Sequence, residues 1–175
     1  IKLFYIPCLF VTQTIFCNQG IRNYYTVESN NSLRISLHNL IDDHSVIPYS
    51  SSSQTDVLDA LKSLFTDTNN SDNVILAYSR RSEPKDNLMM TDGWVAEHLW
   101  NKSYGIENQE PAYSDLFNLM PADWNVSLSR GNNYFDISDP LDLNYRTPGF
   151  DEAPLTSRDS DTWEPPDQIK GDVAR

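Results

Sequence analysis

Cysteine is almost absent from the chain, and the position of the few cysteines narrows the chemistry further. The 175 residues include two cysteines, Cys8 and Cys17, and both lie near the N-terminus. If residues 1–17 are removed from the mature protein, no cysteine remains. Disulfide bonds, zinc–thiolate sites and cysteine nucleophiles are then excluded together.

Residues 1–17 have the pattern of a secretory signal peptide. Lys2 is followed by an apolar run that starts at Leu3, as in the n-region and h-region of such peptides. The run is too short to cross a bilayer as a helix, so we expect no stable membrane anchor. We predict that residues 1–17 are the remnant of a signal and that residues 18–175 form one secreted or periplasmic domain. The alternative is an N-terminal segment that stays attached, either mobile or buried.

Basic residues are also scarce. The chain has 13 Lys and Arg against 25 Asp and Glu, which gives a formal net charge of −12. Such an excess repels polyanions, so the overall charge argues against a protein that binds nucleic acid. Most of the acidic surplus lies between Asp136 and Asp167, however, whereas Lys85 and several other cations lie within residues 80–130. The composition therefore leaves room for a local basic lining in the middle of the chain.

Glycine is rarer than proline, with six residues against ten. Together with the many Asn, Asp and Ser residues, this predicts long ordered loops rather than a helical bundle. The sequence lacks the G-x-S-x-G turn of one class of serine hydrolases, so nothing supports a catalytic triad for His38 or His44. We expect both histidines to be structural or exposed, and the fold to be an irregular α+β domain.

Two apolar stripes predict amphipathic helices early in the domain. Within residues 32–42, leucine and isoleucine recur at i, i+4, i+7 and i+8, and a second stripe occupies residues 57–65. The serine-rich stretch at residues 50–53 supplies turn and cap candidates before the second stripe. Both helices are expected to serve as scaffold.

Strand patterns follow in the middle of the chain. Residues 73–79 form an apolar run bounded by polar residues, which favours a buried strand. Residues 92–100 and 115–120 are also strand-like, and a loop with proline and glycine separates them. Pro121 is expected to end the last of these strands.

A short helix is predicted directly after these strands. In residues 122–130, Trp124 and Leu128 lie on one helical face, and Gly131 can close the helix. Strand, long loop, strand and helix together make a ββα unit. The tryptophans that flank this unit, and that we expect in its core, are Trp94, Trp100 and Trp124. Residues 134–166 show no periodicity and predict a loop or surface wrap, and residues 167–175 resemble the beginning of a helix.

Glu97, His98 and Asn132 offer groups suited to phosphodiester hydrolysis. That reaction needs a base to activate water and a cation to neutralise charge on the phosphate. Neutral imidazole is abundant near neutral pH, and carboxylate and amide oxygens favour hard ions such as Mg²⁺, Mn²⁺ or Ca²⁺. Neighbours on a regular strand point to opposite faces, so Glu97 and His98 converge only if the strand bends or ends there.

Several sequence blocks resemble the endonuclease I family, a branch of the ββα-metal (His-Me finger) nucleases. They read V-I-L-A-Y-S-R-R-S-E-P-K (Val74–Lys85), W-V-A-E-H-L-W-N-K-S-Y-G-I (Trp94–Ile106) and Y-S-D-L-F-N-L-M-P-A-D-W-N-V-S-L-S-R-G-N-N-Y-F (Tyr113–Phe135). A further block, W-E-P-P-D-Q-I-K-G-D-V-A-R, ends the chain at Trp163–Arg175. Order and spacing also match, and the resemblance extends over roughly residues 20 to 175.

The resemblance implies an α+β fold with a ββα-metal core, flanking helices and long loops. It implies a monomeric, secreted or periplasmic endonuclease that cleaves DNA, and RNA as a further substrate, with little sequence specificity. His98 is then the general base, and Glu97 and Asn132 hold one divalent metal, Mg²⁺ or else Mn²⁺ or Ca²⁺. The cations expected to contact the substrate are Arg130, which stands beside the family's metal-binding asparagine, with Lys102, Arg80 and Arg81.

The chain departs from the family pattern at several positions. In W-N-R-E-H-x-W-P it has Val95 and Ala96 in place of Asn and Arg, and Asn101 in place of Pro. In D-L-H-N-L-R-P it has Phe117 in place of His and Met120 in place of Arg. Because the base and the metal ligands are retained, we predict a weakened enzyme. A secreted binding module that has lost activity on the same fold is the alternative.

The family also continues past K-G-D-V-A-R into an apolar helix. We therefore expect the domain to be incomplete at its C-terminus and only marginally stable.

Overall fold

The computed structural model describes residues 31–41, 45–108 and 110–174. The chain divides into two compact units, of which the first ends at Ser45 and the second spans Val46–Arg175. The signal predicted at residues 1–17 and the histidine at position 44 lie outside the described residues. In the first unit, helix α2 (Asn31–Ile41) confirms the first predicted helix, and its His38 is exposed.

Helix α3 (Val57–Leu64) opens the second unit and confirms the second predicted helix. Its N-cap is Asp56, whose carboxylate accepts a hydrogen bond from the Asp59 amide at 2.9 Å. Such a cap satisfies one of the free N–H groups at the start of a helix. Val57 and Leu61 are fully buried, so the predicted apolar stripe is the face that packs on the core.

The first sheet contains β1 (Thr66–Asp67), β2 (Asn70–Ile75) and β3 (Ser82–Pro84), in antiparallel order β1-β2-β3. The strand predicted over residues 73–79 ends earlier, at Ile75. A turn follows, and it brings Tyr78 into the core with 1% exposure.

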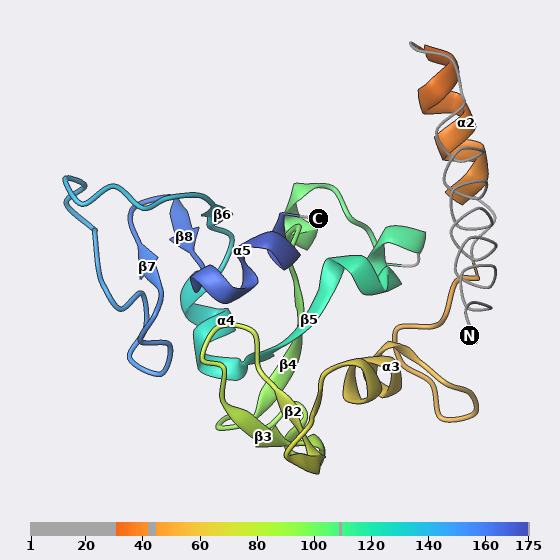
Figure 1. Ribbon diagram of the computed structural model, residues 1–175, viewed down its shortest axis with the longest axis horizontal. Coiled ribbons are helices and arrows are strands. Elements are labelled where there is room, and N and C mark those ends of the chain that lie inside the picture. The colour runs from red at the N-terminus through yellow and green to blue at the C-terminus, as the bar shows by residue number, and fades with distance from the viewer. Residues whose placement is uncertain (1–30, 42–44, 109, 175) are drawn as a thin grey trace, which may run out of the picture. The chain divides into compact units, whose positions relative to one another are not determined.

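The second sheet pairs β4 (Trp94–His98) with β5 (Leu119–Asp123) in antiparallel fashion, from Trp94 opposite Asp123 to His98 opposite Leu119. Figure 1 shows these two strands side by side in the middle of the unit, next to α4. The expectation that the second strand covers residues 115–120 and ends at Pro121 is wrong. Residues 116–118 form a 3-10 turn, and the strand runs through Pro121.

Pro121 is tolerated inside β5 because its missing N–H is not needed there. Its partner across the sheet is Ala96, and its carbonyl oxygen accepts from the Ala77 amide on the other side at 2.8 Å. Proline is accepted at a strand edge that needs no donor from it. The short 3-10 helices of the unit are η1 (Lys85–Asn87), η2 (Lys102–Tyr104), η3 (Pro111–Ser114) and η4 (Leu116–Asn118).

Helix α4 (Trp124–Arg130) follows β5 directly and ends at Gly131, as predicted. The prediction of which face of this helix is buried is wrong, because Leu128 is 67% exposed whereas Val126 and Arg130 are buried. The helix has two stripes at i, i+4 spacing, Trp124 with Leu128 and Val126 with Arg130. The charge of Arg130 gives the second stripe the pattern of a solvent-exposed face in the sequence. A carboxylate neutralises that arginine inside the fold, so its stripe is the one that packs.

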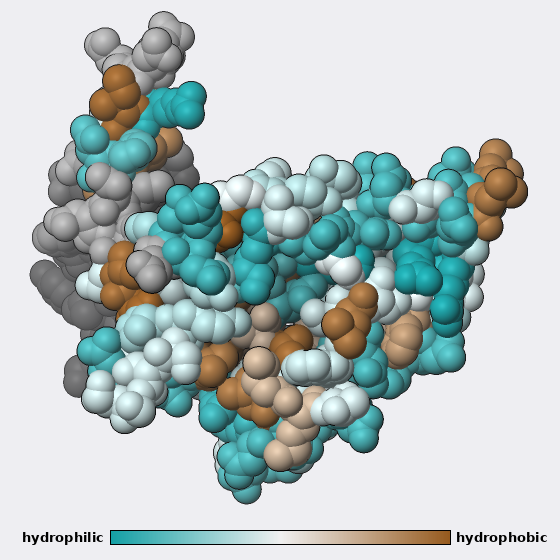
Figure 2. Space-filling model, turned by 180° about the vertical axis from the view of Figure 1, so that it is seen from behind, coloured by the Kyte–Doolittle hydropathy of each residue, from teal (hydrophilic) through white to brown (hydrophobic). Residues whose placement is uncertain are grey.

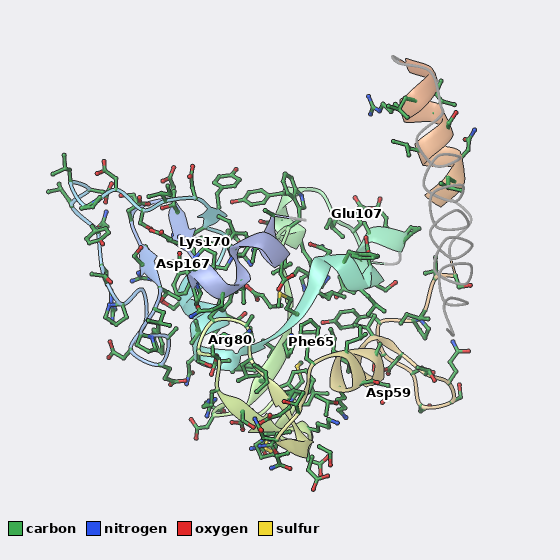
Figure 3. All side chains as sticks on the ribbon, in the orientation of Figure 1. Asp59, Phe65, Arg80, Glu107, Asp167 and Lys170 are labelled. Carbon is green, nitrogen blue, oxygen red and sulfur yellow. The ribbon has the colours of Figure 1, made fainter. Side chains whose placement is uncertain are left out.

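The third sheet was missed from the sequence. It contains β6 (Tyr134–Phe135), β7 (Ser157–Arg158) and β8 (Thr162–Glu164) in the order β6-β8-β7, with β6 parallel to β8. The long connection from β6 to β7 extends as an open loop (Figure 1). Helix α5 (Asp167–Val173) then confirms the predicted last helix, and Figure 3 labels Asp167 and Lys170 on it.

Buried apolar residues cover both faces of the β4–β5 pair. One cluster includes Tyr78, Leu99, Met120, Val126 and Trp163, and the other includes Val57, Leu61, Val74, Trp94 and Leu119. Trp94 is fully buried as expected, but Trp100 is 59% exposed, so its predicted core position is wrong.

Other apolar residues also reach the surface in separate groups, as the brown regions of Figure 2 show. They include Phe117, Leu128, Ile137, Leu141 and Leu143. None of the helices in the described part of the chain is long and apolar enough to cross a membrane.

The mixed α+β architecture is thus confirmed. The unit β4, β5 and α4 has the predicted strand, loop, strand, helix order. Its assignment as a ββα-metal core stays a prediction.

Candidate active site

His98 is the last residue of β4, and its imidazole is held by the main chain. Its Nε2 lies 2.9 Å from the carbonyl oxygen of Tyr113. A carbonyl oxygen only accepts, so this hydrogen bond requires the proton to be on Nε2. Nδ1 then carries the lone pair that a general base needs, on a residue that is 5% exposed.

Two tyrosine rings cover the His98 imidazole. The Tyr49 ring stacks on it with centroids 5.8 Å apart and 14° between the planes, and the Tyr113 centroid lies at 5.0 Å. Burial is the main reason that the pKa of His98 is lowered, and the nearby Lys102 lowers it further. The imidazole is therefore neutral at neutral pH. The same burial raises the pKa of Tyr49 to about 12, so its hydroxyl stays protonated.

Glu97 points to the opposite face of β4 from His98, as regular strand alternation requires. Its Oε1 accepts from the Tyr78 hydroxyl at 3.1 Å and from Arg130 Nη1 at 2.5 Å. Its Oε2 accepts from the Ser127 hydroxyl at 2.5 Å. The strand does not bend to bring Glu97 and His98 together. The convergence that the family resemblance implies is therefore not seen in this arrangement.

Arg130 ends α4 and is 2% exposed. Besides Glu97, its guanidinium donates to the carbonyl oxygens of His98 at 2.8 Å and Leu99 at 2.7 Å. Its guanidinium carbon also lies 4.1 Å from the centroid of the Phe135 ring. The phosphate contact expected for Arg130 fits this geometry poorly, because the residue is 2% exposed and both of its terminal nitrogens donate to protein groups.

Asn132 lies just after Gly131 and is exposed. Its main-chain carbonyl accepts from the Tyr104 hydroxyl. A metal bound directly at Glu97 fits poorly, since three protein donors already occupy the carboxylate. Among the described residues, no group of three or more His, Cys, Asp and Glu side chains is placed to hold a metal ion.

Comparison with known sequences places the chain in a family. The sequence model of the endonuclease I family matches residues 29–175 of this chain. The chain belongs to the endonuclease I family. No solved structure matches it.

Two extracellular ribonucleases are similar to this endonuclease I family chain. The one from Bacillus subtilis (strain 168) is 37% identical over 150 residues, which cover 85% of this chain and 48% of that protein. The one from Bacillus amyloliquefaciens is 36% identical over 150 residues, which cover 85% of this chain and 47% of that protein. The chain therefore spans about half the length of these relatives.

The other cations expected at the site differ in their surroundings. Lys102 is exposed, and its Nζ lies 5.4 Å from the centroid of the Tyr113 ring that covers His98. Arg80 is exposed on the loop between β2 and β3, with a left-handed φ of 59° (Figure 3), and no hydrogen bond or ion pair joins it to the described residues. Arg81 instead forms ion pairs with Glu83 at 3.0 Å and Asp123 at 3.1 Å. Of these three cations, Lys102 is the one that lies over a ring covering His98.

Arg81 is expected to contribute to stability rather than to substrate binding. Asp123 is fully buried, and Arg81→Ala would leave its carboxylate without this partner. We expect the free energy of unfolding to fall by about 1 to 3 kcal/mol, while affinity for an oligonucleotide is retained. Thermal melts and fluorescence anisotropy of the variant measure both. Arg80→Ala is the matched control, with a change in stability of about 0.5 kcal/mol or less. Weaker nucleic-acid binding with unchanged stability in Arg81→Ala would contradict this assignment.

The positions where the family has other residues fall into two groups. Ala96 packs against the apolar cluster on the α3 side of the sheet, and Met120 is 5% exposed in the cluster on the α4 side. Phe117, by contrast, is 78% exposed. Asn101 caps η2, because its Oδ1 accepts from the Ser103 amide at 2.9 Å. The neutral residue at position 120 is therefore part of the core, and the one at position 96 packs against it.

Sequence reasoning missed the residues that surround the candidate base. Tyr49 comes from the loop before α3, and no local pattern marks it as a neighbour of His98. Tyr113 begins one of the family blocks, but its contribution is a main-chain carbonyl, which any residue could supply. Ser127 could have been found, because it lies three residues before Arg130 and therefore on the same side of α4.

Proposed function

We propose that the chain is a nuclease that hydrolyses phosphodiester bonds in RNA and DNA with little sequence specificity, and that His98 is its general base. The hydrogen bond from His98 Nε2 to the Tyr113 carbonyl supports this proposal most directly. It fixes the tautomer in which Nδ1 accepts a proton, and burial under the tyrosine rings keeps the imidazole neutral. Family membership supplies the reaction class.

In the proposed reaction, His98 Nδ1 takes a proton from a water molecule while the water oxygen attacks the phosphorus. The bond from phosphorus to the 3′ oxygen breaks, the 3′ oxygen takes a proton from solvent, and the products carry 5′ phosphate and 3′ hydroxyl ends. Lys102 is the exposed cation placed to contact a backbone phosphate near the base. A divalent ion, which the family resemblance implies, would supply further charge stabilisation. The Glu97 carboxylate does not fit such an ion in this arrangement, so we assign it no step.

RNA is the first substrate to test, because both similar Bacillus proteins are named extracellular ribonucleases. Those names also support an extracellular location for this chain. With a net charge of −12, the chain depends on local cations such as Lys102 and Arg80 to approach a polyanion. Cleavage should therefore slow as the salt concentration rises. We propose that the chain acts as a monomer.

The deciding experiment compares RNA and DNA of the same sequence, single- and double-stranded, with the purified chain. Each substrate is incubated with Mg²⁺, Mn²⁺, Ca²⁺ or EDTA. We expect cleavage at many positions, with 5′ phosphate ends, in at least one metal and no cleavage in EDTA. A chain that melts cooperatively but cleaves no substrate in any metal would contradict the proposed function.

A binding module that has lost catalysis is the second candidate. The neutral side chains of partly buried Ala96 and buried Met120, where the family has arginines, favour it. It predicts measurable affinity for oligonucleotides without cleavage. The same incubations, followed by anisotropy, distinguish it from the nuclease.

A further inference from the structure

We propose that Arg130 and Glu97 position the main chain of His98, and that neither side chain binds the substrate or a metal ion directly. The kinetic part of this inference rests on the proposed function, with His98 as the base. We call Arg130, Glu97, Tyr78 and Ser127 the Arg130 network. Its hydrogen bonds join these four side chains to one another and to the carbonyl oxygens of residues 98 and 99.

The Arg130 network supplies the main-chain carbonyl of His98 with a hydrogen-bond donor that the sheet does not provide. The Leu99 amide donates to the Asn118 carbonyl at 2.9 Å. Bonded and non-bonded pairs alternate along an antiparallel ladder, so His98 and Leu119 exchange no main-chain hydrogen bonds. The His98 carbonyl therefore points away from β5. It would be an unpaired buried acceptor without the bond from Arg130 at 2.8 Å.

The next carbonyl along the chain has the same need. The Leu99 carbonyl faces the point where β5 begins, but the Asn118 amide donates to the Asp115 carbonyl instead, at 2.9 Å. Arg130 Nη2 donates to Leu99 at 2.7 Å. One guanidinium thus fixes the carbonyl of the candidate base and the one after it. Residues 98 and 99 cannot rotate without losing these bonds.

Glu97 neutralises the guanidinium that makes these contacts. Side-chain exposure is 2% for Arg130 and 9% for Glu97, and their closest atoms are 2.5 Å apart. A buried ion is tolerated when its charge is paired and its remaining hydrogen-bonding positions are filled, and Tyr78 and Ser127 fill those of Glu97. Both terminal nitrogens of Arg130 are bonded, whereas its Nε is buried without a partner among the described residues. A divalent ion on the same carboxylate would place further positive charge beside Arg130. The pair therefore fits a positioning role better than metal binding.

Arg130→Lys is the first test. Lysine keeps the charge but lacks the planar fork that bonds Glu97 and two carbonyls together. We expect kcat for a short RNA to fall about tenfold to a hundredfold, with KM and the salt dependence of KM unchanged. Lys102→Met serves as the comparison for a lost phosphate contact, where KM rises and the salt slope decreases by about one. If Arg130→Lys behaves like Lys102→Met, the inference is wrong.

Glu97→Gln is the second test, and it keeps the size of the side chain. We expect kcat to fall while the Mg²⁺ concentration for half-maximal rate stays unchanged. Binding of Mn²⁺ alone to the full chain, followed by electron paramagnetic resonance, should also stay unchanged. Removing even a group that only orients a metal ligand costs about tenfold to a hundredfold in metal affinity, and removing a direct ligand should cost at least as much. Such a loss in Glu97→Gln would overturn the inference, whatever happens to cleavage.

Arg158→Lys is the matched control, because Arg158 also donates to a carbonyl, that of Ser129 at 3.0 Å, outside β4. It should leave kcat unchanged. If Arg130→Lys shows no cooperative unfolding transition in a thermal melt, the Mn²⁺ titration of Glu97→Gln decides the question alone. Absence of cleavage by the unsubstituted chain would refute the proposed function, whereas the Mn²⁺ result tests the positioning role separately.

Discussion

His98→Gln should lower kcat about 10²-fold to 10⁴-fold, the range that a positioned general base contributes. Glutamine retains an N–H that can donate to the Tyr113 carbonyl, so the hydrogen bond at the Nε2 position can persist. It offers no nitrogen lone pair to take a proton from water. KM and the melting temperature are therefore expected to change little. Single-turnover cleavage of a short RNA, with a thermal melt of each protein, measures the effect.

The control is His38→Gln, because His38 is an exposed histidine of α2. Its rate should match that of the unsubstituted chain. Retention of more than a tenth of the rate by His98→Gln would mean that another group activates water.

The pH profile gives an independent check on the base. Burial lowers the pKa of His98, so the neutral form persists to a lower pH than for a free imidazole, whose pKa is about 6.5. Activity should fall as the pH drops through that lowered pKa, so the acid limb of kcat/KM has its midpoint below about 6.5. A midpoint above that value would contradict the burial argument.

Local sequence patterns were sufficient to locate helices α3 and α4. Helix α3 was located by its apolar stripe, although its cap is Asp56 rather than a serine at residues 50–53. The end of α4 was located by Gly131, although its other stripe is the one that packs. Strands as short as β6 and β7 have too few residues to show a period of two. The parallel pairing of β6 with β8 joins distant parts of the chain, and no local signal encodes that contact.

The candidate site shows the same division between local and distant information. Family blocks pointed to Glu97, His98 and Arg130, and those blocks hold a connected set of hydrogen bonds. The role of each residue depends on which face it occupies, and that is decided by the strand pairing. Because β4 stays regular, Glu97 faces α4 whereas His98 faces Tyr49. Sequence alone named the residues but could not assign them to opposite faces.

Met120→Arg should destabilise the chain rather than restore activity. The family has arginine at this position, but Met120 is 5% exposed and lies directly opposite Glu97 in the β4–β5 pair. Cross-strand partners share a face, so a new guanidinium would enter the side that Arg130 already occupies. Overpacking and a second buried cation should cost about 3 kcal/mol or more. For a chain of this size that corresponds to a melting temperature lower by roughly 6 to 12 °C.

The matched control is Met120→Leu, a swap of similar volume that should cost less than about 1.5 kcal/mol. Thermal melts and cleavage rates of both variants separate packing from chemistry. A gain in cleavage rate with an unchanged melting temperature in Met120→Arg would contradict this prediction. It would mean that the new arginine reaches the substrate and that Glu97 pairs with the new arginine instead of with Arg130. A lower melt without a gain in rate would mean that the core has adapted to methionine. In that case the missing family cation cannot be restored by one substitution, because Arg130 already neutralises the carboxylate that a second arginine would need.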